Sequence, residues 1–395
     1  MPLSALPLPT QRFEVRATQS LDYAVDLSHG VLDLANPLLA RTCAGRRLLL
    51  CVSPSIDQLY GAAIRRYFAH HHRSAAWQYC VVATGEALKT LRTVELICEQ
   101  AKHAHMDRHG LLVAFGGGIL CDLVGFAASI YKRGIRYVKV NTTLVGQVDV
   151  GVGVKTGVNF QASKNLLGSY YPAFASINDP HFLHSLPLRQ LSCGLAEIIK
   201  MALILSPELF ELLERQVDGL LCRRFASGQR AEAAADARIL ALAMQLMLDE
   251  LQPNLREHQL ERLVDFGHSF SPVLEIDSEH RLLHGEAVAI DMALCTCIAV
   301  EIGWLTNAEA ARVLALLRAC DLPLLDPATC QLERLESALQ DMALHRAGCI
   351  NVVLPRGLGR ADFLRRPQEL PRELLAAGLA RLHGHRVAPA VAVSA

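Results

Sequence analysis

The sequence predicts an α/β protein in which a Rossmann-like, parallel-sheet N-terminal domain is followed by a mainly α-helical domain. Three observations predict this fold. Strand and helix patterns alternate through the first 180 residues, three glycines follow one of the strands, and helical periodicity dominates beyond Asp179-Pro180. A chain of 395 residues also suits two packed domains. We therefore expect one domain over residues 1–180 and a second over residues 181–395.

The strand patterns lie in the first half of the chain. Residues 12–28 alternate between apolar and polar side chains and predict a β-hairpin. Further strands are predicted at residues 47–52, 78–83, 111–115 and 137–140, and helices at 58–70, 90–105 and shortly after Cys121. Because strands and helices alternate, we expect a parallel sheet covered by helices.

The second half is dominated by helical patterns. Amphipathic helices are predicted at residues 189–205, 207–217, 230–251, 286–302, 309–319 and 333–343. The apolar run at residues 349–354 predicts one late strand or a core insertion. The tail from Val387 is rich in Ala, Val and Pro, so we expect it to be frayed.

Charge and cysteine content exclude several classes of protein. The 39 basic and 39 acidic side chains cancel, and no basic run is interleaved with aromatics, so we expect no nucleic-acid or lipid partner. No apolar run reaches membrane-spanning length, and residues 1–12 lack a secretory signal, so we expect a cytoplasmic protein. The 12 cysteines are scattered, which favours reduced, structural thiols.

The run Phe115-Gly-Gly-Gly-Ile-Leu-Cys-Asp122 places three glycines between a buried strand and a helix. Glycine lets backbone N–H groups approach a pyrophosphate, and a helix N-terminus favours its negative charge. The run lacks the complete dinucleotide fingerprint, so a simple tight turn is the alternative. Glu86 and Lys89 follow the second strand, where they could contact an adenosine or phosphate or form a solvated turn.

Glycine, acidic and lysine residues recur between Asn141 and Gly168. Such a composition disfavours regular helices and strands, but it suits a loop that surrounds a phosphorylated, polyhydroxylated ligand. Asp149 could hold sugar hydroxyls. A phosphate could be neutralised by Lys155, Lys164 and Asn165. A polar surface loop is the alternative.

Three candidate metal ligands lie in the helical half. Glu197 belongs to an apolar helix pattern, where a carboxylate is costly to bury without a partner. His268 and His284 could complete an open zinc site with it. Their spacing is not a local metal motif. Because the chain has 16 histidines and an arbitrary pair rarely binds metal, the alternative is that these two are not ligands. Lys200, one helical turn after Glu197, favours a structural ion pair with it.

Together and in this order, these segments resemble the dehydroquinate synthase superfamily over residues 47–354. The matching motifs are Gly116–Gly118 with Asp122, Arg133-Gly134, Thr142-Thr143-Leu144, Gln147-Val-Asp149, Lys155-Thr-Gly, Lys164-Asn165, Leu186-Pro187, Gly194–Lys200, Gly267-His268 and His284-Gly285-Glu286. The resemblance implies a dehydroquinate synthase-like fold and a sugar phosphate cyclase that uses NAD and one Zn²⁺ ion, for which Co²⁺ can substitute. Because related enzymes are dimers, it also implies a homodimer.

The resemblance also implies roles for individual residues. Zinc is bound by Glu197, His268 and His284. NAD is bound by Glu86, Lys89, Gly117, Gly118, Asp122, Thr142, Thr143, Lys155 and Lys164. The catalytic residues are Asp149, Lys155, Lys164, Asn165 and Lys200. Arg133 is expected to complete the phosphate site from a neighbouring subunit.

One segment departs from the dehydroquinate synthase pattern. That enzyme typically has Asn-Leu-Gly-His-Thr-Phe-Gly-His where this chain has Asp265-Phe-Gly-His-Ser-Phe-Ser-Pro272. Pro272 can neither donate a hydrogen bond nor titrate, and Asp265 would repel a substrate carboxylate. Glu261 stands where an arginine is expected, although Arg262 lies adjacent. The carboxylated sugar 3-deoxy-arabino-heptulosonate 7-phosphate is therefore a poor fit.

The changed pattern resembles the branch of the superfamily that acts on sedoheptulose 7-phosphate. Leu251, Asp265 and His345 are similar to the residues of 2-epi-5-epi-valiolone synthases, whereas desmethyl-4-deoxygadusol synthases tend to have Glu, Ala and Thr there. The implied reaction is transient oxidation by NAD, phosphate elimination, reduction, ring opening and intramolecular aldol closure to 2-epi-5-epi-valiolone. The expected substrate-binding residues are Arg133, Asp149, Asn165, Leu251, Arg262, Asp265 and His345.

Other functions stay open from the sequence. Within the superfamily, the alternatives are a desmethyl-4-deoxygadusol synthase and a 3-dehydroquinate synthase. A metal-dependent polyol dehydrogenase would share the two-domain architecture, but the lysine-containing segment at residues 155–165 argues against it. A non-enzymatic homologue that binds nucleotide would not need all of the candidate metal ligands.

Overall fold

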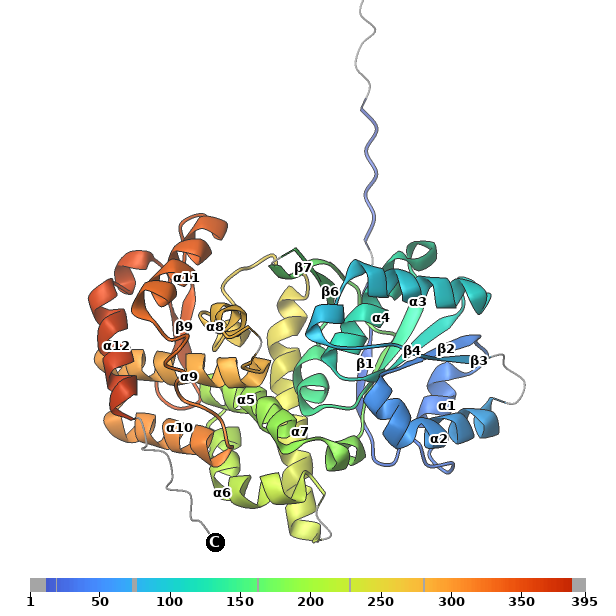
Figure 1. Ribbon diagram of the computed structural model, residues 1–395, viewed down its shortest axis with the longest axis horizontal. Helices are drawn as coiled ribbons and strands as arrows, with labels where there is room; N and C mark the ends of the chain where they lie inside the picture. The colour runs from blue at the N-terminus through green and yellow to red at the C-terminus, as the bar shows by residue number, and fades with distance from the viewer. Residues whose placement is uncertain are drawn as a thin grey trace, which may run out of the picture.

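The computed structural model describes residues 12–18, 20–72, 77–161, 163–226, 229–279 and 281–385. In this part of the chain, strands and helices alternate up to Asn178, and helices dominate afterwards (Figure 1). The predicted α/β fold with a mainly helical second half is therefore confirmed.

Parallel strands form the central sheet of the first half. In their order along the sheet they are β1 (Ala24–Leu27), β8 (Ala175–Asn178), β5 (Arg136–Asn141), β4 (Leu111–Gly116), β2 (Leu48–Val52) and β3 (Trp77–Val81). Every pairing between neighbours is parallel. All of these strands therefore end at the same edge, which is the edge where open α/β sheets bind ligands.

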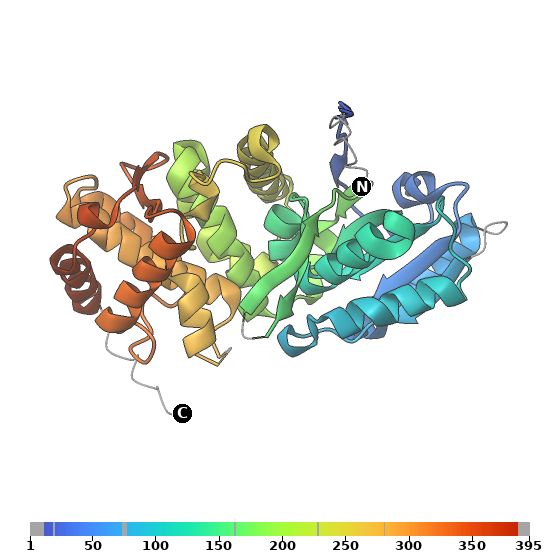
Figure 2. The ribbon, with the colours of Figure 1, turned by 90° about the horizontal axis from the view of Figure 1, so that it is seen from above.

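Helices cover both faces of this sheet (Figure 2). Leu48 of β2 packs on one face and Leu49 on the other, and both are buried. Because both faces are covered, the central strands are continuous apolar runs, which the sequence shows clearly. The covering helices are α1 (Leu38–Cys43) and α2 (Pro54–His71) on one face, with α3 (Leu91–His103) and α4 (Gly118–Ile130) on the other.

The hairpin predicted at residues 12–28 is wrong. Among the described residues of this range, only Ala24–Leu27 forms a strand, and it pairs in parallel with β8 from the end of the domain. The alternating pattern thus belongs to a single edge strand. Residues 12–18, which precede it, are extended and exposed and project away from the body of the protein (Figure 1).

The segment after Asn141 is more regular than the sequence predicts. A π-helical turn, η3 (Gly146–Val150), leads to an antiparallel hairpin of β6 (Lys155–Phe160) and β7 (Ser163–Tyr170). The expectation of irregular structure is wrong because tertiary packing stabilises this hairpin. β6 packs along α4, and Val158 is fully buried in the core that it shares with that helix.

The second half of the described chain is a helical domain. It contains α5 (Leu188–Leu205), α6 (Pro207–Arg223), α7 (Arg230–Leu251), α8 (Ser271–Asp277), α9 (His284–Glu301), α10 (Asn307–Ala319), α11 (Leu332–His345), α12 (Arg372–Gly384), and a hairpin of β9 (Val352–Pro355) and β10 (Ala361–Leu364). The predicted helices and the late strand are confirmed, whereas α8, α12, β8 and β10 were not predicted. The tail from Val387 lies outside the described residues. No helix in the described ranges is long and apolar enough to cross a membrane.

Close packing of α5 against α9 brings candidate ligands together. Almost every residue of both helices is buried, so both belong to the core of the domain. Gly285 permits the approach, because a Cβ at this position would lie 2.3 Å from the Cα of Cys193. The contact places Glu197 of α5 next to His284, the first residue of α9.

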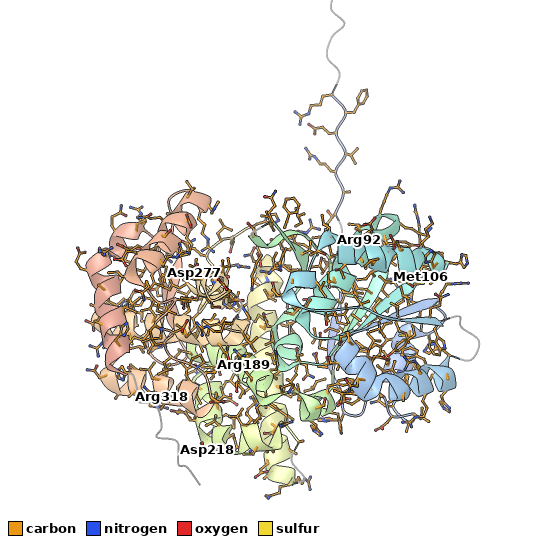
Figure 3. The ribbon with its side chains drawn as sticks, in the orientation of Figure 1. Arg92, Met106, Arg189, Asp218, Asp277 and Arg318 are labelled. Carbon is orange, nitrogen blue, oxygen red and sulfur yellow. The ribbon has the colours of Figure 1, made fainter. Side chains whose placement is uncertain are left out.

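An ion pair at the same end of α9 reinforces this packing. Arg189 of α5, labelled in Figure 3, places its Nε 2.6 Å from Oε1 of Glu286 and its Nη2 2.7 Å from Oε2. Glu286 also accepts a hydrogen bond from the backbone N–H of Leu283 at 2.8 Å. This carboxylate therefore caps α9 and binds α5 at the same time.

Candidate active site

Glu197, His268 and His284 form one compact group. Nε2 of His284 lies 3.2 Å from Oε1 of Glu197, and Nε2 of His268 lies 4.0 Å from the same oxygen. The two imidazole rings are 5.3 Å apart between centroids. The potential donor atoms of the group all lie within 4.8 Å of one another, as a single metal ion requires.

Hydrogen bonds at the far side of each ring orient these histidines. Nδ1 of His268 lies 3.0 Å from the carbonyl oxygen of Phe266, and Nδ1 of His284 lies 3.0 Å from Oε1 of Glu275. Because both oxygens can only accept, each Nδ1 carries a proton, and Nε2 is the atom of each ring that faces Glu197 and can bind a metal ion once it is deprotonated. This is the usual arrangement around metal-binding histidines.

The electrostatics of the group fit a divalent cation. Burial raises the pKa of Glu197, but Lys200 and both histidines outweigh burial and hold the pKa well below its usual range. Burial and Lys200 lower the pKa of His268, which favours a neutral imidazole. Burial also lowers the pKa of His284, but Glu197 and Glu275 raise it to about 10, so this position attracts positive charge. One carboxylate and two imidazoles are a typical catalytic zinc set.

Glu197 itself needs a further partner. Its side chain is completely buried, and Lys200 Nζ lies 2.6 Å from Oε2, so the predicted ion pair is confirmed. Within the described residues, however, neither carboxylate oxygen makes a hydrogen bond of favourable geometry. Oε1, which faces both histidines, is thus the position where a bound cation would satisfy the buried carboxylate.

Lys200 connects this group to two predicted substrate residues. Burial lowers the pKa of Lys200, but Glu197, Asp149 and Asp265 outweigh burial and raise it. Asp149 belongs to η3 of the first half, and Asp265 ends η6 (Leu263–Asp265) just before His268. The structure therefore brings residues from both halves around one buried ammonium.

Lysines of the β6–β7 hairpin pair with carboxylates of the helical half. Lys155 Nζ lies 2.6 Å from Oε1 of Glu257, and Lys164 Nζ lies 2.5 Å from Oε2 of Glu275. Burial raises the pKa of Glu275, but His284 and Lys164 outweigh burial and lower it to about 2. The sequence interpretation missed both Glu257 and Glu275. The signal for Glu275 is an acidic residue directly after the apolar pair Val273-Leu274.

The glycine loop lies at the edge where the sheet strands end. α4 begins at Gly118, and the carbonyl oxygen of Gly116 accepts a hydrogen bond from the N–H of Thr142 at 3.0 Å. A Cβ at Gly117 would lie 2.8 Å from Cγ2 of Thr143. Glycine is therefore needed where this loop packs on the two threonines, and the loop leaves the N-terminus of α4 uncovered by its own side chains.

Most of the other predicted nucleotide residues gather beside this loop. Nζ of the buried Lys89 lies 2.5 Å from Oδ2 of Asp122 and 2.6 Å from Oδ1 of Asn165. Oε1 of Glu86 accepts a hydrogen bond from Nδ2 of Asn159 at 2.8 Å and lies 3.7 Å from Nζ of Lys164. The hairpin and the sheet edge therefore form one continuous polar surface.

Two predicted substrate residues lie close to this surface. Leu251 ends α7 beside the loop after η3, where a Cβ added to Gly153 would lie 3.9 Å from its Cδ1. Arg262 forms ion pairs with Asp265 and with Glu257. They therefore surround the Asp149 and Lys200 region.

Two other predicted residues have exposed side chains. Arg133 is exposed, in a left-handed backbone conformation with φ of 67°. His345 is exposed at the end of α11. Nη2 of the next residue, Arg346, lies 3.6 Å from Oδ2 of Asp265. Arg346 is therefore the residue of this segment that contacts Asp265.

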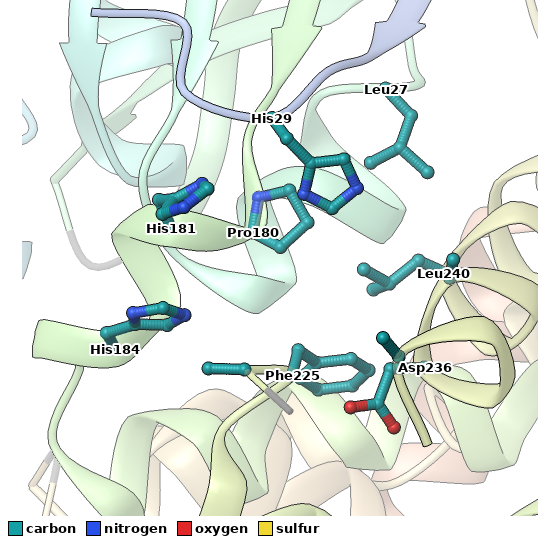
Figure 4. A pocket seen from close by; sticks show the side chains of 11 residues that line it. Leu27, His29, Pro180, His181, His184, Phe225, Asp236 and Leu240 are labelled. Atoms are coloured by element: carbon teal, nitrogen blue, oxygen red, sulfur yellow. The ribbon is translucent and has the colours of Figure 1, made fainter. Parts of the chain in front are cut away.

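A second cluster of possible ligands consists of His29, Asp179 and His181. Its two histidines line a pocket of about 320 Å³ (Figure 4). The carboxylate of Asp179 and one ring nitrogen of His181 already form hydrogen bonds within the chain. Oδ2 of Asp179 accepts from the N–H of Val31 at 2.7 Å, and Oδ1 accepts from the N–H of His181 at 3.0 Å. Gly30 N–H donates to Nδ1 of His181 at 3.2 Å. We therefore assign the metal to the Glu197 group.

The sequence matches two family models. The model for the 3-dehydroquinate synthase N-terminal domain covers residues 79–193, and the model for the C-terminal domain covers residues 194–343. The chain belongs to the dehydroquinate synthase family. The predicted family and fold are thus confirmed, and the boundary between the two matched regions falls within α5.

Members of the family are similar over nearly the whole chain. A 2-epi-5-epi-valiolone synthase of Streptomyces glaucescens is 49% identical over 93% of this chain and 93% of its own length. A demethyl-4-deoxygadusol synthase of Trichormus variabilis is 32% identical over 93% of this chain and 89% of its own. The solved structure of the 2-epi-5-epi-valiolone synthase ValA from Streptomyces hygroscopicus subsp. jinggangensis 5008, with NAD⁺ and Zn²⁺ bound, has a TM-score of 0.88 and 41% identity, and the match covers 95% of this chain and 100% of that chain.

Proposed function

We propose that this protein is a 2-epi-5-epi-valiolone synthase that converts sedoheptulose 7-phosphate into 2-epi-5-epi-valiolone and inorganic phosphate. The observation that carries the proposal is the buried Glu197, His268 and His284 group, with Lys200 beside it and the lysines of the hairpin across from it. A cation site next to several ammonium groups suits a substrate with both hydroxyls and a phosphate. The similarity to 2-epi-5-epi-valiolone synthases supports this choice.

We propose that the sheet domain, residues 1–180, binds NAD and that residues 181–395 bind the metal and much of the substrate. Bound NAD would accept and return one hydride, and bound Zn²⁺ or Co²⁺ would polarise a sugar oxygen. The Gly116–Gly118 loop at the N-terminus of α4 suits a pyrophosphate. Lys89 and Asp122 lie beside it, as nucleotide-binding residues should.

The chain's own side chains would bind and orient the sugar. Lys155 and Lys164 would exchange their carboxylate partners for the phosphate of the substrate and stabilise its departure. Asn165 would contribute its amide to the same phosphate. Lys200 and Asp149, which interact electrostatically, would hold sugar hydroxyls near the metal and keep the reacting carbon oriented.

Asp265 supports the choice of a substrate without a carboxylate. It lies near Lys200 and is paired with Arg262 and Arg346. The positive charges of these two arginines are therefore already neutralised by a carboxylate of the chain. A substrate carboxylate would have to displace Asp265 from them, which disfavours 3-dehydroquinate synthase activity. We propose that Asp265 and Leu251 contact the hydroxymethyl ketone end of the sugar and that His345 approaches this end when substrate binds.

We also propose that the protein acts as a cytoplasmic homodimer. All 12 cysteines are free thiols, as expected in a reducing compartment. Arg133 is exposed and follows the C-terminal end of α4, whereas the glycine loop precedes the N-terminal end of that helix, which suits a contribution to the phosphate site of a second copy.

The test is to incubate the purified protein with NAD⁺, Zn²⁺ and sedoheptulose 7-phosphate and to identify the product by NMR. We expect 2-epi-5-epi-valiolone with release of inorganic phosphate and no accumulation of NADH. Desmethyl-4-deoxygadusol as the product would refute the product assignment, because it would place the protein with the other synthases of the same branch. Stoichiometric NADH without phosphate release would instead indicate a polyol dehydrogenase.

A further inference from the structure

Glu275 joins the two sides of the candidate site. It lies on α8 with a buried side chain. Its Oε1 is 3.0 Å from Nδ1 of His284, and its Oε2 is 2.5 Å from Nζ of Lys164. A single carboxylate thus connects the β6–β7 hairpin of the sheet domain with a candidate metal ligand of the helical domain.

The two partners of Glu275 compete for its negative charge. The ammonium of Lys164 carries a full charge, so it interacts with the carboxylate more strongly than a neutral imidazole N–H does. An anion that binds Lys164 would take this ammonium away from Glu275. The carboxylate would then bind the Nδ1–H of His284 more strongly, and a stronger acceptor at Nδ1 makes Nε2 a better metal donor.

We propose that Glu275 is a positioning residue that couples anion binding at Lys164 to metal binding at His284. The inference rests on the proposed function, because it takes the metal to lie among Glu197, His268 and His284. Oε1 of Glu275 orients the imidazole, and Oε2 holds Lys164 in place until an anionic ligand replaces it. Because such coupling is reciprocal, the metal also tightens binding of the anion.

The test measures Zn²⁺ affinity of the full chain by competition with a chromophoric chelator, alone, with NAD⁺ and with inorganic phosphate. In the wild type we expect NAD⁺ or phosphate to tighten Zn²⁺ binding by about 5- to 150-fold, the usual range of coupling between sites. Glu275→Gln keeps the shape of the side chain but removes its charge. It should weaken Zn²⁺ binding by about 10- to 100-fold and bring the coupling factor close to one.

A matched control and a second variant make this test specific. Asp277→Asn removes a carboxylate from the same helix, α8, that pairs with Arg334 instead of the candidate site, so Zn²⁺ affinity and coupling should not change. Lys164→Gln leaves the contact between Glu275 and His284 in place. It should bind Zn²⁺ at least as tightly as the wild type without anion, but show no tightening on addition of phosphate or NAD⁺. Co²⁺ absorption provides a spectroscopic check, since only Glu275→Gln should change the ligand field.

The outcomes separate this inference from the proposed function. Normal Zn²⁺ affinity and normal coupling in Glu275→Gln would overturn the role of Glu275 and leave the metal site intact. If Glu275→Gln does not fold, Lys164→Gln decides, because retained coupling in that variant overturns the proposal and lost coupling supports it. Failure of the wild type to bind Zn²⁺ would overturn the proposed function as well.

Discussion

The ammonium of Lys200 lies 2.6 Å from the carboxylate of Glu197, one turn earlier on α5, and both side chains are almost completely buried. A buried ion pair does not by itself indicate stability, because desolvation offsets much of the attraction between the charges. This pair has a different consequence. Lys200 keeps Glu197 ionised, and an ionised carboxylate that faces the Nε2 atoms of two histidines is a ligand set that suits a divalent cation.

Lys200→Met should destabilise the metal-free protein, because it removes the ammonium that pairs with the buried Glu197 carboxylate. The expected loss is about 3–5 kcal/mol in the free energy of unfolding, measured in urea after treatment with a chelator. Saturating Zn²⁺ should restore part of this loss, since the metal supplies the missing positive charge. The double variant Glu197→Gln with Lys200→Met should lose less stability than Lys200→Met alone; an equal or larger loss would contradict the role of the pair.

Removal of the metal should abolish product formation and lower thermal stability. A ligand that binds only the folded state at about 100 times its dissociation constant adds about 2.7 kcal/mol. Elemental analysis after dialysis should find one equivalent of zinc in the wild type and none in His268→Ala with His284→Ala. The control is His29→Ala with His181→Ala, which alters the second cluster and should retain the zinc. Loss of zinc from this control would show that the second cluster, and not the Glu197 group, binds the metal.

Asp291 should make stability depend on pH. Its Oδ2 accepts backbone N–H groups of Phe270 and Ser271 at 2.5 and 2.9 Å, which shapes the segment after His268. Burial raises its pKa from 3.8 to about 6, although these hydrogen bonds lower it. Because the folded pKa exceeds the unfolded one, the protonated form stabilises the fold. This contribution is complete below the unfolded pKa and is lost as pH rises through the folded value.

The measurement is urea unfolding of the wild type and Asp291→Asn from pH 4 to pH 7. The difference between the two free energies of unfolding should change by about 3 kcal/mol over this range, in the direction that weakens the wild type as pH rises. Above the folded pKa the difference should be constant. A difference that is independent of pH throughout would show that Asp291 does not take up a proton on folding.

Gly285→Ala should disturb the metal group through packing alone. The added methyl would lie 2.3 Å from the backbone of Cys193, so α5 and α9 must separate where Glu197 meets His284. We expect a loss of about 1–3 kcal/mol in the free energy of unfolding, together with weaker Zn²⁺ binding. Gly384→Ala is the control, because a Cβ there meets no atom within 4 Å. Equal behaviour of the two variants would refute the packing argument.

The sequence predicts the parts of this protein that depend on local patterns. The buried strand Leu48–Val52 is recognisable as a short apolar run and the helix Arg230–Leu251 as a long segment of helical pattern, and both are confirmed. The pairing of β1 with β8 could not be predicted, because it joins segments at opposite ends of the sheet domain. The β6–β7 hairpin was missed because its glycines and lysines obscure the alternation that its packing on α4 requires.

In the candidate site too, some residues are recognisable from the local sequence and others only from the fold. Glu197 is conspicuous in the sequence as a carboxylate within an apolar helix, and family motifs point to His268 and His284. Glu275 and Glu257 are not conspicuous in the sequence. Their role depends on lysines that lie more than 100 positions earlier and that only the fold brings near. The proximity of Arg346 to Asp265 likewise depends on where α11 ends.

The central claim is that NAD is returned unchanged while the sugar loses phosphate. The most direct test supplies the metal-loaded protein with excess sedoheptulose 7-phosphate and a limiting amount of NAD⁺, and follows phosphate and NADH together. The account predicts that many equivalents of phosphate are released for each NAD⁺, with no net NADH. Phosphate release that stops at one equivalent, or NADH that accumulates with turnover, would contradict it.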